Sequence, residues 1–467
     1  MHAFTRKTGK VIILLLAAVA VLFAVAACNR GGGDSGETIP GVDHSQPPRL
    51  IRLASWHDYG PGLGIRAERP DPNEEDDYEV AMMQWNNANA VAERFNVRFE
   101  SFTVGEYHEF HEAFLAHQLA NDPIGDLIVI SGSYMQAALA GSHIIDIATL
   151  QYPGSNLFGA QTVVRPGLQM GGSIYSLDTG APSRQHFWLG VNWDMVQRLG
   201  LQDPVALFDA GNWTWDAFLS MTRAAGAAGY WGVSGWVRDF AQGIIAMNDG
   251  QIATDNFMYA LDSPNTLAAI ELLETLWNEE LYWHEPGNVD SIWDWWGLST
   301  AFHGNDVLFW AAEFWHAGMV GYDWSDPPYE FRIVPFPRGP QGSGRYHGLR
   351  GFQGGWAIPT GVQDPQLVFR VFEALNEWPG DDLWILTDAD DADTRQMLWT
   401  EKCVEINNFV ARNTRFDAGI AAGIGDIPGN VADWVFQGVR TAAEAAEYLR
   451  GESQETLDNT ARVMGLR

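Results

Sequence analysis

The sequence predicts an α/β fold built from two units with mainly parallel sheets, and three observations support this. Short apolar stretches typical of strands alternate with amphipathic stretches typical of helices from residue 50 onward. Residues 126–130 form a nearly continuous apolar run, as expected for a strand of a parallel sheet that is covered on both faces. The chain has 467 residues, which is enough for about two to four domains.

The first unit alternates between strands and helices. Residues 80–95 carry apolar side chains at helical spacing, and residues 96–102 alternate as a half-buried strand does. Asp122 and Pro123 end the next helix. The expected elements are strands at 50–54, 96–102, 126–130 and 144–147, and helices at 80–95, 106–119 and from about 131 to 140.

The second unit follows a hairpin arm at residues 172–175, and Thr214 is a candidate N-cap for a helix that begins beside it. No internal repeat is evident. The expected strands are 187–192, 307–310, 331–335 and 355–358, and the expected helices are 194–199, 265–280, 365–378, 442–449 and 453–463.

The charge balance excludes some functions. The chain has 59 Asp and Glu against 28 Lys and Arg, a net charge of −31, and its only lysines are Lys7, Lys10 and Lys402. A phosphate-binding groove needs clustered basic side chains, so neither a nucleic-acid partner nor an anionic lipid surface is expected. Only two cysteines, Cys28 and Cys403, are present, so no disulfide framework is possible.

The N-terminus has the pattern of a secretory signal. Basic residues precede the uncharged apolar run 11–27, which ends in the sequence VAAC at residues 25–28. This resembles the lipobox of bacterial lipoproteins. The resemblance implies cleavage after residue 27 and a lipid on Cys28, which would hold the protein on the extracytoplasmic face of the cell membrane. The alternative is an uncleaved anchor, although seventeen residues are short for a span.

Residues 28–48 are expected to form a flexible tether. Five of the twenty residues from 29 to 48 are glycine, three are proline, and almost none is apolar. A coil of this length has a root-mean-square reach of about 25 Å. Such a tether would let a folded domain stand clear of a membrane.

Seven segments in a fixed order carry a resemblance to a known family. The chain resembles the extracellular solute-binding proteins of family 1, the carbohydrate receptors of ABC importers. The matching segments are LASW at 53–56, DLIV at 126–129, GVNWDM at 190–195, WTWDAF at 213–218, FHGNDVLF at 302–309 followed by Trp315, VPFPRG at 334–339, and GWAI at 355–358 followed by Pro365. Several family positions are replaced, among them the proline expected where Gly125 stands.

The resemblance implies a periplasmic-binding-protein-like fold of two α/β lobes with the ligand in a cleft between them. It also implies that the chain crosses between the lobes more than once. The expected organisation is a signal peptide at 1–27, a tether at 28–48, lobe one at 49–163 plus 348–385, and lobe two at 164–347 plus 386–467.

Candidate ligand-binding residues follow from the chemistry of sugars. A sugar ring has apolar C–H faces and a belt of hydroxyl groups, so its site needs flat aromatic faces with hydrogen-bonding side chains around them. Loops after parallel strands bring such groups together. The candidates are Trp56, Asp58, Ser133, Arg184, Trp236, Glu313, Trp315, Trp356 and Trp434. Each tryptophan could instead belong to the core, and Trp315 is the one we expect to be the main stacking platform.

No cofactor or metal is predicted. His108 and His111 have a spacing that could bind a metal, but the HExxH pattern is missing. The acidic residues between 388 and 393 lack the glycine and terminal glutamate of a calcium loop. We expect both groups to be solvated.

Three functions remain open. The leading hypothesis is a monomeric, non-enzymatic receptor that binds a carbohydrate and delivers it to the transmembrane subunits of an ABC importer. The second is a surface glycoside hydrolase, whose two carboxylates, about 5–9.5 Å apart, could come from Asp58, Asp239, Glu313 and Asp433. The third is a surface lipoprotein without a small ligand. The sequence does not identify the sugar, and it leaves a peptide or a polyol open as the solute.

Overall fold

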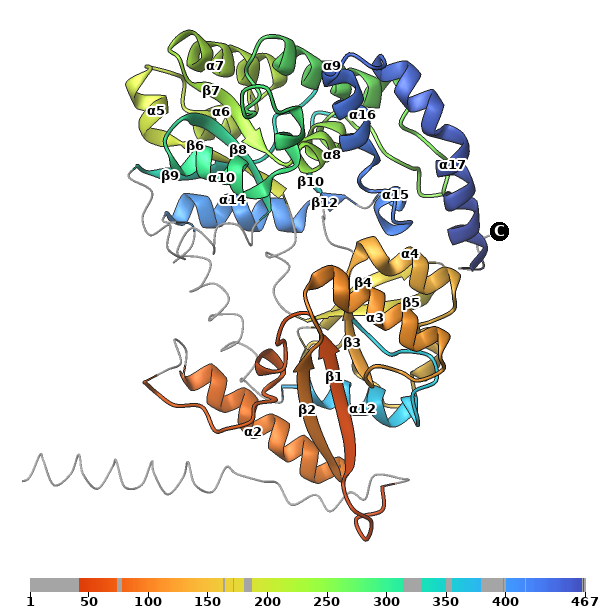
Figure 1. Cartoon of the computed structure of the whole chain (residues 1–467). Coiled ribbons are helices and arrows are strands. Elements are labelled where there is room, and N and C mark those ends of the chain that lie inside the picture. The colour runs from red at the N-terminus through yellow and green to blue at the C-terminus, as the bar shows by residue number, and fades with distance from the viewer. Residues whose placement is uncertain are drawn as a thin grey trace, which may run out of the picture.

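The computed structural model describes residues 42–73, 78–162, 164–170, 172–179, 187–313, 329–349, 355–378, 398, 400–415, 417–463 and 465. These residues form two α/β lobes, which lie one above the other in Figure 1. Among them, no helix combines the length and the apolar character needed to cross a membrane. The predicted signal peptide, Cys28 and most of the predicted tether lie outside the described residues.

Lobe one contains a six-stranded sheet in the order β2-β1-β3-β11-β5-β4. Its strands are β1 (Arg49–Ser55), β2 (Val97–Thr103), β3 (Leu127–Ile130), β4 (Val164–Met170), β5 (Ser173–Thr179) and β11 (Gly355–Ala357). Its helices are α2 (Tyr78–Phe95), α3 (Tyr107–Leu119), α4 (Gly132–Ala140) and α12 (Pro365–Leu375), with 3-10 turns η1 (Pro61–Leu63) and η2 (Ile147–Leu150).

Strand β3 explains why this sheet has helices on both faces. All four of its residues are buried, and they alternate between two cores. Leu127 and Val129 pack into the core that includes α2 and α12, whereas Ile128 and Ile130 pack into the core that includes α3 and α4. The prediction of a strand covered on both faces is confirmed.

The strand directions gather several chain ends at one edge of this sheet. Strand β1 is parallel to β2 and to β3, and β11 is antiparallel to both β3 and β5. The carboxyl ends of β1, β2, β3 and β5 therefore lie at the same edge as the amino end of β11. We call this the carboxyl edge of lobe one.

Lobe two contains a four-stranded sheet in the order β7-β8-β6-β9 and a small two-stranded sheet of β10 and β12. Its strands are β6 (Phe187–Asn192), β7 (Trp231–Gly235), β8 (Val307–Glu313), β9 (Phe331–Val334), β10 (Gly348–Leu349) and β12 (Thr414–Arg415). Its helices are α5 (Trp193–Arg198), α6 (Pro204–Asp209), α7 (Trp215–Ala227), α8 (Val237–Met247), α9 (Pro264–Asn278), α10 (Trp295–His303), α14 (Glu401–Arg412), α15 (Ala418–Ala421), α16 (Ile427–Phe436) and α17 (Ala442–Val463), with a 3-10 turn η4 (Val289–Trp293).

The second sheet has a corresponding edge. Strand β7 is parallel to β8, whereas β6 is antiparallel to β8 and β9. The carboxyl ends of β7, β8 and β9 therefore meet the amino end of β6, and we call this the carboxyl edge of lobe two.

Thr214 accepts a hydrogen bond from the N–H of Ala217 at 3.5 Å, which confirms it as the N-cap of α7.

The two lobes contact each other through three helices. Helix α4 of lobe one packs against α15 and α17, which belong to lobe two, and Figure 1 shows these helices side by side. Ala138 and Leu139 of α4 belong to the same buried cluster as Leu457 and Ala461 of α17. An apolar contact thus joins the lobes on the side of the C-terminal helix.

The strand pairing shifts the lobe boundaries. The hairpin β4–β5, which the sequence-based boundary placed in lobe two, pairs with β11 in the sheet of lobe one. Strand β10, which that boundary placed in lobe one, pairs with β12 and contacts α8 and α14 of lobe two. We therefore place the first boundary after Thr179 and the second after Leu349.

Three expected elements differ from the structure. Helix α8 begins at Val237, in a segment for which no helix was expected, although its polar residues Arg238, Asp239 and Gln242 lie at helical spacing. The two expected C-terminal helices are one continuous helix, α17. The expected strand at 144–147 is a single bridge at Ile144 followed by η2.

The chain enters lobe one through a clamp made by Asn96. The side-chain amide of Asn96 donates hydrogen bonds to the carbonyl oxygens of Asp43 (2.9 Å) and Gln46 (3.0 Å). The N–H of Arg49 in turn donates to the Asn96 carbonyl at 3.0 Å. Because β1 runs from Arg49 to Ser55, this clamp lies at the end of lobe one opposite its carboxyl edge.

Candidate ligand-binding site

A cluster of aromatic rings occupies the carboxyl edge of lobe one. Trp56 follows β1, Tyr107 begins α3 directly after β2, and Tyr134 lies in the first turn of α4 after β3. The ring centre of Trp56 lies 5.2 Å from that of Tyr107 and 5.0 Å from that of His111. His111 stacks on Tyr134 with ring centres 4.1 Å apart and planes inclined by 10°. Trp56, Tyr107 and Tyr134 are half-buried, so parts of these rings face solvent.

The buried side chain of His111 holds this cluster in place through its hydrogen bonds. Its side chain is 0% exposed. Nε2 accepts a hydrogen bond from the N–H of Ser131 (3.0 Å), and Nδ1 lies 2.6 Å from the carbonyl of Tyr107. Because a backbone N–H only donates and a carbonyl only accepts, these contacts assign a neutral imidazole with its proton on Nδ1. Burial lowers the pKa of His111 to about 4, in agreement with the neutral form.

The hydroxyl groups of the cluster form a second layer of contacts. The hydroxyl of Tyr107 contacts Oγ of Ser131, and the hydroxyl of Tyr134 lies 2.8 Å from Nδ1 of His108. His111 is therefore part of the packed edge and not of a solvated helix face, whereas His108 is exposed. Among the described residues, no three His, Cys, Asp or Glu side chains converge in a way that could hold a metal ion.

Asp58 lies beside this cluster on the loop after β1. Its carboxylate accepts hydrogen bonds from Oγ of Ser101 (2.6 Å) and from the N–H of Gly60 (3.0 Å). Tyr59 packs edge-on against Trp56 with ring centres 5.7 Å apart. Burial raises the pKa of Tyr59 to about 12, so its hydroxyl keeps its proton at neutral pH. The loop thus presents an exposed carboxylate next to half-buried aromatic rings.

Two further predicted residues lie on lobe one. Trp356 of β11 is only 6% exposed. Its ring packs against Phe372 at 6.2 Å, and its Nε1 donates to Oγ1 of Thr179 at 3.3 Å. In this conformation Trp356 is a core residue with little ring surface for a ligand. Ser133 lies in the first turn of α4, next to the aromatic cluster in sequence, and its side chain is outside the described part.

The carboxyl edge of lobe two brings Trp236 and Glu313 together. Trp236 follows β7 and Glu313 ends the neighbouring parallel strand β8. The indole of Trp236 is half-buried, and its Nε1 donates to the carbonyl of Trp293 at 3.0 Å. The guanidinium of Arg238 lies over the Trp236 ring, 4.8 Å from its centre.

Arg238 is surrounded by three carboxylates, which together with it we call the Arg238 cluster. Nε lies 2.6 Å from Asp239, Nη1 lies 3.4 Å from Asp426, and Nη2 lies 3.9 Å from Glu313. Burial alone would lower the pKa of Arg238, but Asp239 and Glu313 raise it above its usual value. Asp239 is 1% exposed, and burial raises the pKa of its carboxyl group. Its second oxygen, Oδ2, is buried and has no hydrogen-bond partner in the described part of the chain.

Trp434 lies apart from these residues. It packs edge-on against Tyr448 of α17, with ring centres 5.6 Å apart. The guanidinium of Arg440 lies 5.6 Å from the Trp434 ring centre and 4.1 Å from that of Tyr448. The structure thus places Trp434 between α16 and α17. Arg184 and Trp315 lie outside the described residues.

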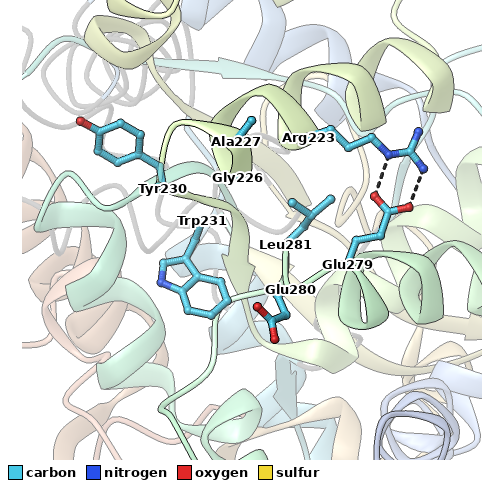
Figure 2. Close-up of a pocket in the computed structure, with 9 residues that line it drawn as sticks. Arg223, Gly226, Ala227, Tyr230, Trp231, Glu279, Glu280 and Leu281 are labelled. Atoms are coloured by element: carbon cyan, nitrogen blue, oxygen red, sulfur yellow. Dashed lines mark hydrogen bonds and ion pairs between the residues drawn. The ribbon is translucent and has the colours of Figure 1, made fainter.

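A separate groove opens at the other end of the β7 strand. It has a volume of about 420 Å³ and lies where α7 and α9 end. Figure 2 shows Trp231 and Glu280 on one side and the pair of Arg223 and Glu279 on the other, joined by two contacts of 2.7 Å. Since Trp231 begins β7 and Trp236 follows its end, this groove lies away from the carboxyl edge of lobe two.

Sequence reasoning did not select several residues that shape these edges. Tyr107, His111 and Tyr134 were not among the predicted ligand-binding residues, and neither was Arg238. The four-residue spacing of Tyr107 and His111 places them on one helix face directly after a strand, which is a signal that could have found them. Tyr134 could have been found from its position after β3.

The topology defines a two-lobe α/β fold of the periplasmic-binding-protein type, the fold of ABC-transporter substrate-binding proteins. The sequence matches no protein-family profile and no curated protein at a significant level.

Solved structures with this fold include the cyclic α-maltosyl-1,6-maltose binding protein of Arthrobacter globiformis, with a TM-score of 0.61 and 13% identity over 88% of this chain and 100% of that one. UgpB of Mycobacterium tuberculosis, in complex with glycerophosphocholine, has a TM-score of 0.60 and 16% identity over 88% and 99% of the two chains. The GacH receptor of Streptomyces glaucescens, solved with acarbose, has a TM-score of 0.58 and 11% identity over 90% and 99%.

Proposed function

We propose that this protein is a lipid-anchored extracytoplasmic receptor that captures a carbohydrate, most simply an oligosaccharide, and delivers it to an ABC importer. The observation that carries the proposal is the gathering of aromatic and hydrogen-bonding side chains at the carboxyl edges of both sheets. Trp56 with Tyr107 and Tyr134 offers ring faces in lobe one, and Trp236 with Glu313 offers a ring and a carboxylate in lobe two.

The binding site would lie between these two edges. Aromatic faces cover the apolar side of a sugar ring, while carboxylates, phenol hydroxyls and imidazoles exchange hydrogen bonds with its hydroxyl groups. Trp315 remains our proposal for the main stacking platform, because it follows β8 in sequence just beyond Glu313. Asp58 and Ser133 are proposed as polar contacts at the lobe-one side, and Arg184 is proposed as a further polar contact.

The ligands named for the structurally similar proteins support a small water-soluble molecule as the ligand. Those named above were solved with or named for cyclic α-maltosyl-1,6-maltose, acarbose and glycerophosphocholine. The three compounds all carry hydroxyl groups and differ in size and charge, so the fold alone does not select among them.

A thermal-shift screen over mono-, di- and oligosaccharides, polyols and glycerophosphodiesters tests the proposal. A compound that binds only the folded state stabilises it by RT ln(1 + [L]/Kd), about 2.7 kcal/mol at one hundred times Kd. A sugar that raises Tm with the logarithmic dependence on concentration that this expression gives supports the proposal. If a polyol or phosphodiester raises Tm and no sugar does, the carbohydrate part of the proposal is wrong.

The glycoside hydrolase remains the second candidate, and the same samples distinguish it. Asp239 is 1% exposed and pairs with Arg238, so it is not accessible to a sugar bond, and a hydrolase would have to use Glu313 at this edge. A receptor leaves an oligosaccharide intact, whereas a hydrolase produces shorter products. Mass spectrometry of each stabilising oligosaccharide before and after incubation with the protein gives the answer.

A further inference from the structure

We infer that the carboxyl edge of lobe two selects its solute by charge: it accepts uncharged or amine-bearing groups and rejects carboxylates and phosphates. This inference rests on the proposed function, because it concerns the solute bound between the two edges. It is carried by the geometry of the Arg238 cluster.

The first step is that Arg238 is already occupied. An arginine near a binding edge ordinarily indicates an anionic ligand, because its planar fork matches a carboxylate or a phosphate. Here each of its three nitrogens faces a different carboxylate, those of Asp239, Asp426 and Glu313. One face of the guanidinium lies over Trp236. An anionic ligand would therefore have to displace a carboxylate of the protein.

The second step is the charge balance. The cluster holds one guanidinium and three carboxylates, a formal excess of two negative charges. If Asp239 were protonated, an excess of one would remain. The N-termini of α8 and α16 also lie here, and each is equivalent to about half a positive charge. Together the two N-termini offset about one of the negative charges, so the edge keeps an excess of about one negative charge with Asp239 ionised and is close to neutral with Asp239 protonated.

The third step is how these charges are shielded. Only 25% of the Arg238 side chain and 12% of the Glu313 side chain are exposed, so water screens their interactions less than it does on an open surface. The half-buried indole of Trp236 adds the negative face of an aromatic ring. A protonated amine meets favourable groups at this edge, and a carboxylate or phosphate meets unfavourable ones.

A thiol probe measures this preference without any ligand. Asn430 is exposed on α16, and its N–H donates to the carbonyl of Asp426 one turn earlier, so Asn430→Cys places a thiol next to the cluster. The background is the full chain with Cys28→Ser; Cys403 is 1% exposed and does not compete. The rates of modification by a trimethylammonium and a sulfonate methanethiosulfonate reagent are compared.

The control is Asn86→Cys on α2, an exposed position of lobe one whose neighbours one turn away, Met82 and Ala90, are uncharged. Since charged clefts change association rates by about ten-fold or more, the cation-to-anion rate ratio at position 430 should exceed that at position 86 by about ten-fold. Glu313→Gln and Asp426→Asn should each lower the ratio at position 430.

The outcomes are distinct. Equal ratios at the two positions, or a ratio at position 430 that neither substitution lowers, would overturn the inference. Since Asp426 is 60% exposed, Asp426→Asn should keep the fold, and its ratio is interpretable even if Glu313→Gln unfolds.

A matched set of sugars connects the probe with the proposed function. D-glucose, D-glucosamine and D-glucuronate share a ring and differ in charge. Stabilisation by glucose or glucosamine but not by glucuronate supports the inference, and stabilisation by glucuronate equal to that by glucose overturns it while the proposed function stands. If none of the three nor any larger sugar stabilises the protein while the thiol ratio is high, the charge preference of the edge is supported, and its role in selecting a sugar is overturned together with the proposed function.

Discussion

Replacing His111 should remove one source of acid sensitivity in lobe one. The unfolded chain binds a proton on this imidazole below about pH 6.5, whereas the folded protein does so only below about pH 4. The folded state therefore binds fewer protons in this window, and stability that is present above pH 6.5 is lost as the pH falls towards 4. Protonation also breaks the hydrogen bond from the Ser131 N–H, because Nε2 would become a donor.

The magnitude follows from the two pKa values. The full difference of about 2.5 pKa units corresponds to about 3 kcal/mol at 1.36 kcal/mol per unit. At pH 5 the same two values give a loss of about 2 kcal/mol relative to neutral pH. The side chain is 0% exposed, so little solvent screening reduces these figures.

Urea unfolding at several values between pH 7.5 and pH 5 measures this loss. His111→Gln should be less stable than the wild type at pH 7.5, and its free energy of unfolding should fall by about 2 kcal/mol less on going to pH 5. Phe114→Leu, on the same helix and also 0% exposed, is the matched control, because it weakens the core but keeps the imidazole. Parallel pH profiles for the wild type and His111→Gln would refute the reasoning.

Three further predictions concern other parts of the chain. Trp315→Ala should weaken sugar binding about 30- to 700-fold, measured by calorimetry, while its free energy of unfolding stays near normal. Trp356→Ala should instead lose about 3–5 kcal/mol of folding free energy, measured by a denaturant melt. The opposite pattern would mean that Trp315 is the core residue and Trp356 the ligand contact. A Cβ on Gly429 would lie 2.7 Å from Cη2 of Trp293, so Gly429→Val should destabilise lobe two by about 1–3 kcal/mol in a melt, and an unchanged melt would contradict this packing. Cys28→Ser should leave the membrane fraction or remain unprocessed, and a mature, detergent-dependent variant would exclude lipidation.

The sequence predicted the strands well where hydrophobic pattern alone decides the structure. The run at 127–130 is a strand covered on both faces, and the alternation at 97–103 is an edge strand. Helix α8 was missed although Arg238, Asp239 and Gln242 mark one polar face at helical spacing, so here the signal was present in the sequence. The hairpin β4–β5 was assigned to the wrong lobe because local pattern carries no information about which sheet a strand joins.

The sequence predicted where the candidate site lies better than it predicted which of its side chains are buried and which are exposed. Trp56, Trp236 and Glu313 lie at carboxyl edges, as expected for residues that follow parallel strands. Whether a tryptophan exposes a ring face depends on neighbours from other elements: Trp356 is covered by Phe372 of α12 and by Tyr59 of the loop after β1. The Arg238 cluster likewise joins residues from α8, β8 and the start of α16, which no short motif brings together.

The Asn96 clamp has a mechanical consequence for a molecule held by its N-terminus. Because Asp43 and Gln46 are hydrogen-bonded to lobe one, the part of the tether that can extend runs from Cys28 to about residue 42. Fully extended, it spans at most about 50 Å. It departs from the pole opposite the carboxyl edge, and β1 alone adds about 20 Å between that pole and Trp56. If Cys28 carries a lipid, the tether joins lobe one on the side away from its carboxyl edge. The proposed receptor would then have to turn on this tether to bring that edge to a membrane protein, and the length of the tether would limit the movement.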